Sequence, residues 1–394
     1  MAADIRALTG VRGIAAVVIV AYHFGDVQLT GGGNVAYFRI PHGYLPVDLF
    51  FMLSGYVIAL TYRDAFDGSV RNYASFMLKR VARLYPAYLA IGLLYVAKIA
   101  AGLSGQARLS MFSLSDIVGN TLMMTGWGLH IQPLIGVAWA ASAEMGSYLL
   151  VPVLLPLTVR RSPLLCGVTV AAALLAIVAV SFSGRGSSGP LDVVNGNSFY
   201  PLLRAVAGFT LGMAIFRFPG VLDRLSAAAQ DVLLAVILGS ILITEILAAD
   251  DRLLYLLFIP LVAVLSRDGR LGQALFGNAL VYRLGIISYS IYLIHPLFVS
   301  FVLRAWRHFG QTEAVYLASC AVCFTAIWLL SEASYRLIEM PGRKAIVDLA
   351  TGNRDHPPPR EDHGEDPGPA EAQAGVGRRR HPAGVRPVRS PCCR

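Results

Sequence analysis

Charged side chains are scarce in this sequence. Of its 394 residues only 14% are Asp, Glu, Lys or Arg, and 56% belong to the hydrophobic class, whereas soluble proteins carry about 25% charged residues. So few charges cannot cover the water-facing surface of a chain this long, which excludes a soluble multidomain enzyme, a disordered protein and a fibrous repeat. The apolar residues gather in blocks that match the roughly 20 residues needed to cross a bilayer. The composition predicts an all-α, polytopic transmembrane helix bundle.

Cysteine is also scarce, and its placement argues against metal or redox chemistry. Cys320 and Cys323, two of the five cysteines, form a C-x-x-C inside an apolar run, where they read as small apolar residues on a buried helix face. No second pair of ligands lies near them in the sequence, so we predict no metal site. We also predict no cleavable signal peptide, because the first apolar run contains Arg12 and His23 and lacks a convincing cleavage site.

The net charge of +9 does not indicate a nucleic-acid partner. Residues 1–349 contain 25 Lys and Arg against 18 Asp and Glu, and these charges cluster in the loops of one side. Such clustering is a signal of membrane topology. We therefore expect membrane lipids, and no nucleic acid, around the body of the chain.

Ten apolar spans can be marked along the sequence, of which the seventh and eighth are the least distinct. With the N-terminus in the cytoplasm, the inner loops receive 17 Lys and Arg and the outer loops receive 8. This two-to-one excess follows the positive-inside rule and predicts about ten helices in the cell membrane with both termini cytoplasmic. The expected spans are 8–26, 44–62, 82–102, 137–157, 163–183, 199–217, 229–248, 252–266, 281–303 and 313–335.

The composition changes abruptly near residue 350. Residues 350–394 are rich in Pro, Gly and Arg and contain almost no large apolar side chain, so they cannot bury a core. The sequence predicts a membrane domain over 1–349 and a disordered C-terminal tail over 350–394. The arginine run 378–380 could touch anionic headgroups, although a solvated tail is the favoured interpretation.

Ionisable side chains inside apolar spans are costly and usually functional, and the first span contains two. Arg12 and His23 are eleven positions apart, which is three helical turns plus about 20°, so they share one helix face about 16 Å apart along the axis. Arg12 lies near the cytoplasmic edge and His23 lies deeper. The pattern indicates an anion held at the inner side and proton transfer above it. The alternative is a snorkelling arginine and a structural histidine.

The second span opens with Asp48, a carboxylate that needs a cationic or hydrogen-bonding partner. His23 is a candidate, because the two helices are sequential and a carboxylate that orients an imidazole is a recurrent catalytic pair. A helix-capping aspartate is the alternative. Glu144 is a second acid, seven residues into the fourth span.

Arg80 and Arg83 precede the third span and share one helix face. Paired guanidinium groups suit phosphate, although ordinary positive-inside anchoring explains them equally well. In the ninth span, Tyr292 and His295 are three residues apart and can face one interior. The sequence therefore predicts a polar pathway through the bundle. It is formed by the two histidines, the two acids and the arginines at the cytoplasmic end.

These residues also carry a family resemblance. The sequence resembles the acyltransferase-3 family of integral membrane O-acyltransferases over about residues 4–344, because six of the family's motifs occur in order. They are Arg12-x10-His23, the Asp-Leu-Phe-Phe block with Ser54 over Asp48–Gly55, Arg80-x-x-Arg83, Trp139-x-x-Ser142-x-Glu144, the Ile-Ser-Tyr-Ser block with Tyr289 and Tyr292 over Ile287–His295, and Glu339-x-Pro341.

The resemblance implies transfer of an acyl group, usually acetyl, from cytoplasmic acyl-CoA to a hydroxyl of a carbohydrate or carbohydrate-like acceptor. It implies acyl-CoA as a co-substrate with no bound cofactor, and polysaccharide-synthesis proteins as possible partners. His23 is then the catalytic candidate as general base or acyl carrier, with Asp48 or Glu144 orienting it. Arg12, Arg80 and Arg83 are candidates for donor binding.

The remaining motif residues, Ser54, Ser142, Tyr289, Tyr292 and His295, are assigned to the acceptor site or pathway. The sequence departs from the family at Ala140 and Ala141, where bulkier residues are common, and has a single acid at Glu144 where many members have two. Larger relatives add an extracytoplasmic esterase-like domain, which we do not expect here. The rival functions are a proton-coupled transporter and a non-catalytic partner in polysaccharide export. The chain shows no internal repeat of the kind that many transporters have.

Overall fold

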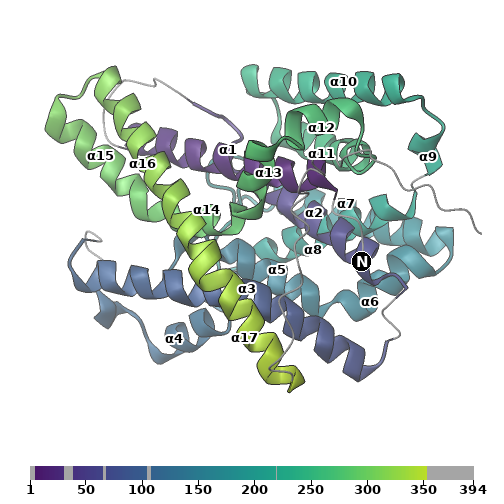
Figure 1. The fold of residues 1–394 in the computed structure, drawn as a ribbon, viewed down its shortest axis with the longest axis horizontal. Coiled ribbons are helices and arrows are strands. Elements are labelled where there is room, and N and C mark those ends of the chain that lie inside the picture. The colour runs from purple at the N-terminus through teal and green to yellow at the C-terminus, as the bar shows by residue number, and fades with distance from the viewer. Residues whose placement is uncertain (1–4, 31–38, 65–67, 104–107, 219, 353–394) are drawn as a thin grey trace, which may run out of the picture. The chain divides into compact units, whose positions relative to one another are not determined.

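A computed structural model describes residues 5–30, 39–64, 68–103, 108–218 and 220–352, and every regular element in these ranges is a helix (Figure 1). The expectation of an all-α chain is confirmed, and the predicted tail lies almost wholly outside the described residues. The α-helices are α1 Arg6–Thr30, α2 Pro46–Tyr62, α3 Val70–Ala100, α4 Leu114–Thr121, α5 Trp139–Leu149, α6 Val151–Leu155, α7 Pro163–Ser181, α8 Tyr200–Arg217, α9 Gly220–Asp223, α10 Ala227–Ile246, α11 Asp251–Leu265, α12 Arg270–Phe276, α13 Ala279–Ile286, α14 Ser288–Ile294, α15 Pro296–Phe309, α16 Glu313–Ser334 and α17 Met340–Thr351. The short elements are η1 Leu109–Met111, η2 Gly136–Ala138, η3 Pro156–Arg160 and η4 Tyr335–Glu339.

Several of these helices are long and apolar enough to cross a membrane. Four meet this description in the described residues, namely α1, α7, α10 and α16 with its continuation. Two bent pairs raise the number to six, and α2 is a shorter apolar helix. The remaining spans of the expected ten stay predictions.

Two of the expected spans are broken. The fourth bends by 58° between α5 and α6, and the ninth bends by 53° between α14 and α15. Pro152 and Pro296 lie in the first turn after each break, and proline removes a backbone donor and clashes with the preceding turn. The second break puts His295 at the junction of two helices.

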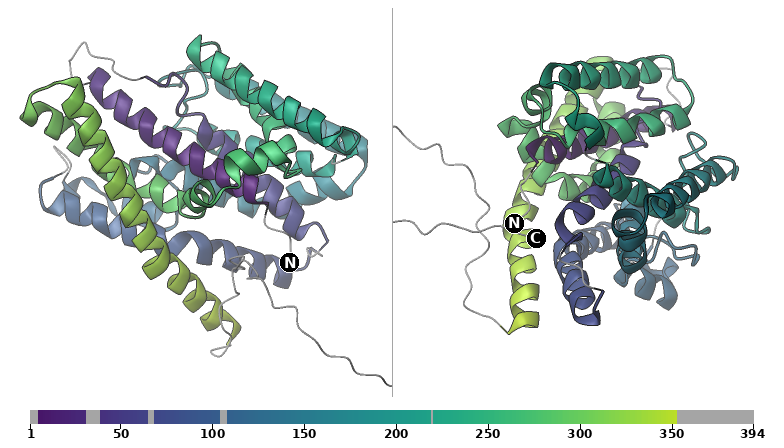
Figure 2. Two further views of the ribbon diagram at one scale, coloured as in Figure 1. Left: turned by 45° about the horizontal axis from the view of Figure 1, so that its top comes forward. Right: turned by 90° about the vertical axis from the view of Figure 1, so that its right-hand side faces the viewer.

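Glycine lets α2 and α8 pack backbone to backbone. A Cβ atom on Gly55 would lie 1.9 Å from the carbonyl oxygen of Phe209, and one on Gly212 would lie 1.9 Å from that of Met52. Gly13 and Gly285 play the same part between α1 and α13, which lie side by side in Figure 2. Small residues at helix contacts are typical of membrane bundles.

The buried apolar side chains form two clusters on either side of this packing. One is built mainly from α1, α3, α5 and α14–α16, and the other from α2, α7, α8 and α10–α12. Phe50 of α2 packs against both clusters. The candidate site lies along α1 and α2, where the two clusters meet.

The segment between α3 and α5 is fastened by polar contacts. Ser113 and Asp116 form a capping box at the start of α4, and the Gln132 amide donates to Asp116 Oδ1 at 2.7 Å. Gly126 donates its amide to Ser142 Oγ at 3.0 Å. This segment is thereby held against the first turn of α5.

Candidate active site

Arg12 lies at the inner end of the predicted stripe, on the wall of a narrow cavity of about 40 Å³. Its guanidinium carbon is 5.8 Å from the Phe50 ring. The cavity is lined by Arg12, Val47, Phe50, Phe51, Ala140, Ala141, Glu144, Ser288, Tyr289 and Tyr292. A cavity of this size is large enough for water, and it lies between α1, α2, α5 and α14 with Arg12, Glu144 and Ser288 among its otherwise largely apolar and aromatic lining.

The three arginines predicted to bind a donor come together here. Arg80 and Arg83 of α3 are both electrostatic neighbours of Arg12. Arg80 donates to the Tyr62 hydroxyl at 3.1 Å and lies within 6 Å of the Phe76 and Tyr148 rings. Neither Arg12 nor Arg83 has a carboxylate within salt-bridge distance in the described part of the chain. The cluster therefore combines positive charge with unused hydrogen-bond donors.

Glu144 is one acid of this cluster, and Glu339 is another, as an electrostatic neighbour of Arg83. Glu144 Oε1 accepts hydrogen bonds from Ser54 Oγ at 2.5 Å and from the Tyr148 hydroxyl at 2.6 Å, and Glu144 is an electrostatic neighbour of Arg12. The structure thus joins Ser54, Glu144 and Arg12 from three helices. Tyr148, one turn after Glu144, was not expected from the sequence.

Asp48 pairs with Arg204 in place of His23. Arg204 donates from Nε to Asp48 Oδ1 at 2.7 Å and from Nη2 to Asp48 Oδ2 at 2.5 Å, and both side chains are fully buried. The cationic partner that a buried Asp48 requires is therefore Arg204, where we had expected His23. The Arg204 guanidinium also lies 5.4 Å from the Trp139 ring, and Arg204 was not among the residues predicted for the site.

His23 meets a second imidazole. Its ring stacks on that of His295 with centroids 5.0 Å apart and planes 28° apart. His295 is completely buried, and neither of its ring nitrogens has a hydrogen-bond partner in the described residues. Buried polar groups are nearly always satisfied, so His295 is a buried imidazole whose two ring nitrogens are both available for hydrogen bonding.

Three predicted hydroxyl residues make contacts within the protein. The Tyr289 hydroxyl donates to the Leu84 carbonyl at 3.1 Å and the Tyr292 hydroxyl donates to the Val137 carbonyl at 2.9 Å. Both rings still line the cavity. The Ser142 hydroxyl accepts the hydrogen bond from the Gly126 amide described above, so it holds the loop that precedes α5.

Aromatic rings connect the two ends of the stripe on α1. The Phe50 ring, beside Arg12, is 6.2 Å from Tyr292, and Tyr292 is 5.8 Å from His295, which stacks on His23. Arg12 and His23, predicted on one face of one helix, are thus the ends of a single series of side chains.

The chain is similar to several known proteins. A family model described as an acyltransferase domain matches residues 5–332. The chain is 25% identical to the peptidoglycan O-acetyltransferase OatA of Listeria monocytogenes over 89% of this chain and 58% of OatA. It is 26% identical to the acyltransferase MdmB of Streptomyces mycarofaciens over 87% of this chain and 94% of MdmB. The first group of curated relatives that it matches is longer, and the chain spans 57% of their length. No solved structure matches.

Proposed function

Because the chain belongs to the acyltransferase-3 domain family, we propose that it is an integral membrane enzyme that transfers an acyl group to a hydroxyl. The acyl group is acetyl, the donor is cytoplasmic acyl-CoA and the acceptor is a carbohydrate or carbohydrate-like compound. The name of OatA supports acetyl transfer. The observation that carries the proposal is the stacked pair of His23 and His295, together with a cluster of arginines at the other end of α1. Among the described residues, neither ring nitrogen of His295 has a hydrogen-bond partner.

The proposal includes the membrane placement. Ten helices cross the cell membrane, with both termini in the cytoplasm. Arg12 and the Arg80–Arg83 pair then lie at the cytoplasmic side, where CoA is available. The two-to-one distribution of Lys and Arg between the loops supports this orientation.

Donor binding is assigned to the arginine cluster. The phosphates of acyl-CoA bind Arg12 and Arg83, neither of which has a carboxylate within salt-bridge distance in the part of the chain that the structure describes, while Arg80 is held in place by Tyr62. Guanidinium groups bind phosphate through forked hydrogen bonds. The pantetheine arm then carries the thioester along α1 towards His23.

His23 acts as the general base. It takes the proton of the acceptor hydroxyl while the hydroxyl oxygen attacks the thioester carbonyl, and the carbon–sulfur bond breaks. The proton returns from the imidazolium to the sulfur, so that CoA leaves as the thiol. General-base assistance contributes about 10²–10⁴-fold. His295 holds the acceptor hydroxyl or the thioester oxygen through one of its ring nitrogens.

The test measures transfer of label from acetyl-CoA by purified protein in lipid nanodiscs. His23→Ala is expected to lose about 10²–10⁴-fold in rate, and His295→Gln is expected to lose activity through poorer positioning. His308→Ala is the matched control, because His308 is an exposed histidine at the end of α15.

Full activity in a well-folded His23→Ala protein would remove His23 from the mechanism. Label retained on the wild-type protein without acceptor, and absent from His23→Ala, would make His23 an acyl carrier. Solute uptake into vesicles without label transfer would favour the transporter instead.

A further inference from the structure

Helix α14 leads directly into His295 and is too short to hold its own position. It spans the seven residues Ser288–Ile294 and is followed by the 53° bend at which His295 lies. A helix of this length is marginal in isolation, so tertiary contacts determine where it lies. The orientation of the His295 ring therefore depends on the side chains that fasten α14 to its neighbours.

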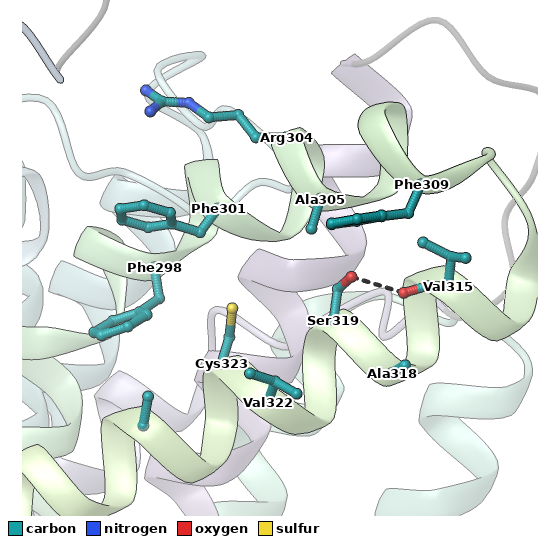
Figure 3. A pocket seen from close by; sticks show the side chains of 11 residues that line it. Phe298, Phe301, Arg304, Ala305, Phe309, Val315, Ala318, Ser319, Val322 and Cys323 are labelled. Carbon is teal, nitrogen blue, oxygen red and sulfur yellow. Dashed lines mark hydrogen bonds between the residues drawn. The ribbon is translucent and has the colours of Figure 1, made fainter.

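The helix on the other side of the bend gives His295 limited support. Phe298 and Phe301 of α15 line one wall of a groove of about 560 Å³, and Val322 and Cys323 of α16 line the other (Figure 3). Side chains that face such a space lack the packing contacts of a core residue. This part of α15 is thus less tightly held than a helix packed on all sides, which leaves more of the positioning to α14.

Three hydroxyl groups fasten α14 to the rest of the bundle. Tyr289 and Tyr292 donate to backbone carbonyls of α3 and η2, as described above. Ser290 is completely buried and donates its hydroxyl to Glu339 Oε1. Ser290 Oγ is also hydrogen-bonded to Ser334 Oγ at 2.9 Å. Of the three hydroxyl groups, only that of Ser290 donates to an ionisable side chain.

The segment that carries Glu339 has a geometry that brings two side chains to Ser290. Ser334 and Glu339 are five residues apart, and in an α-helix they would point about 140° away from each other. The segment η4 is a π turn, in which the Met340 amide donates to the Tyr335 carbonyl five residues earlier. Such a turn places residues five apart on one side of the helix, and π turns are frequent at functional sites.

The Glu339 carboxylate also lies beside the arginine cluster. It is an electrostatic neighbour of Arg83, and the chain after η4 approaches α3 closely, because a Cβ atom on Gly342 would lie 2.6 Å from Pro86 Cβ. A carboxylate that follows an apolar span is costly to bury and usually functional. Packing α14 in place would need only an apolar side chain at this position.

We propose that Glu339 is a positioning residue for acyl transfer. It holds α14 through Ser290, and α14 in turn presents His295 to His23. Glu339 does not touch the reacting groups, and its effect reaches them along the five residues from Ser290 to His295. The inference rests on the proposed function, because it concerns the histidine pair that carries that proposal.

The test measures acetyl transfer in nanodiscs together with the NMR signals of isotope-labelled histidine. Glu339→Ala should lower kcat about tenfold to 10²-fold, since a misplacement of about 1 Å can cost 10²-fold, and KM for acetyl-CoA should change less than kcat. The ring signals of His295 should shift, while those of the exposed His308 should not. Ser290→Ala removes the same hydrogen bond and should have the same effects. Glu313→Ala, which removes an exposed acid at the start of α16, should behave as the wild type.

A variant background shows whether Glu339 acts through His295. In a His295→Gln protein, Glu339→Ala should cost less than about twofold, because effects of residues that act through one another are not additive. Equal losses in the two backgrounds, or unchanged His295 signals in Glu339→Ala, would overturn the proposal. Ser290→Ala carries the same comparisons if Glu339→Ala does not fold. A wild-type protein that transfers no acetyl group would contradict the proposed function instead, and the NMR signals would still test whether Glu339 positions His295.

Discussion

Asp48 and Arg204 are individual residues whose contribution can be separated from that of the surrounding packing. Each fully buried charge is neutralised by the other. Removing one partner of such a pair leaves an uncompensated buried charge, which typically costs about 3–5 kcal/mol.

We therefore expect Arg204→Met to lower the free energy of unfolding by about 3–5 kcal/mol. The double variant Asp48→Leu, Arg204→Met should recover much of this loss, because it removes both charges together. Unfolding in detergent, followed by circular dichroism, measures the difference. Additive losses in the double variant would contradict the interpretation of a coupled pair.

Arg12 and Arg83 are expected to bind the donor. Charge-assisted hydrogen bonds contribute about 1.5–3 kcal/mol each, so Arg83→Gln should weaken acetyl-CoA binding about tenfold or more. Arg12→Gln should do the same. Lys79→Gln is the control, because Lys79 is an exposed cation on the same helix. Calorimetric titration measures the dissociation constants, and equal constants in all variants would reduce the arginines to topology anchors.

At this scale the sequence identifies candidate residues better than their partners. The rule that ionisable groups inside apolar spans are functional selected Arg12, His23, Asp48 and His295. The same rule should have selected Arg204, which lies five residues into the sixth expected span. The pairing of Asp48 with Arg204 joins helices that are 156 residues apart, and no local pattern encodes that contact.

Among the elements, the contact of α2 with α8 depends on the absence of side chains. Gly55→Ala would put a methyl group 1.9 Å from the Phe209 carbonyl oxygen, so the helices must move apart. We expect a loss of about 1–3 kcal/mol, measured by thermal unfolding. Gly167→Ala in α7 is the matched control, since a Cβ there has nothing within 4 Å, and it should be neutral or stabilising by up to about 1 kcal/mol. Similar losses in the two variants would contradict the close approach.

The capping box of α4 makes the stability of its segment depend on pH. Hydrogen bonds from the Ser113 side chain, the Gln132 amide and the Ser113 amide lower the pKa of Asp116. Because the folded pKa lies below the unfolded value of about 3.9, this stabilisation is present above that value and is lost as the pH falls through the folded pKa.

Asp116→Asn should therefore lower the melting temperature at pH 7 and have a smaller effect near pH 3. Melting curves of wild type and variant at the two pH values check this. A difference that grows towards acid pH would show that Asp116 acts through another contact.

The distribution of apolar residues predicted where the helices lie, but it did not predict where a helix is interrupted. The expected spans 163–183, 199–217 and 229–248 lie close to α7, α8 and α10. The ninth span was expected as one helix and is divided among α13, α14 and α15. Pro296 was visible in the sequence, but a proline can end, kink or start a helix, and the surrounding packing decides which.

For the whole molecule, the proposed topology has a direct test. Reporter domains fused before Met1 and after Gly352 should both lie in the cytoplasm, and a cysteine placed at Gln311, between α15 and α16, should react with a membrane-impermeant reagent from outside. The reason is the excess of Lys and Arg in the inner loops. Termini on opposite sides would mean an odd number of spans and would contradict the ten-helix arrangement.

The chemistry of the whole chain was easier to infer than its count of spans. Because the chain has few charges, each ionisable side chain inside an apolar span could be recognised from the sequence. Six motifs in the same order as in the family indicated which family it is. The number of helices that cross the membrane depends on how each bent or short helix sits in lipid. That property belongs to the packed bundle and its bilayer together.

The fixed separation of Arg12 and His23 on α1 has a consequence for donor choice. Eleven residues of helix hold the two side chains about 16 Å apart along the axis, and a rigid helix cannot shorten that span. A donor whose phosphates bind Arg12 can place its acyl group at His23 only if the arm between them spans the distance from Arg12 to His23. Acetyl phosphate is too short to touch both ends. If acyl-CoA binds as proposed, helix α1 therefore selects donors by the length of the arm between phosphate and thioester, whatever the acyl group.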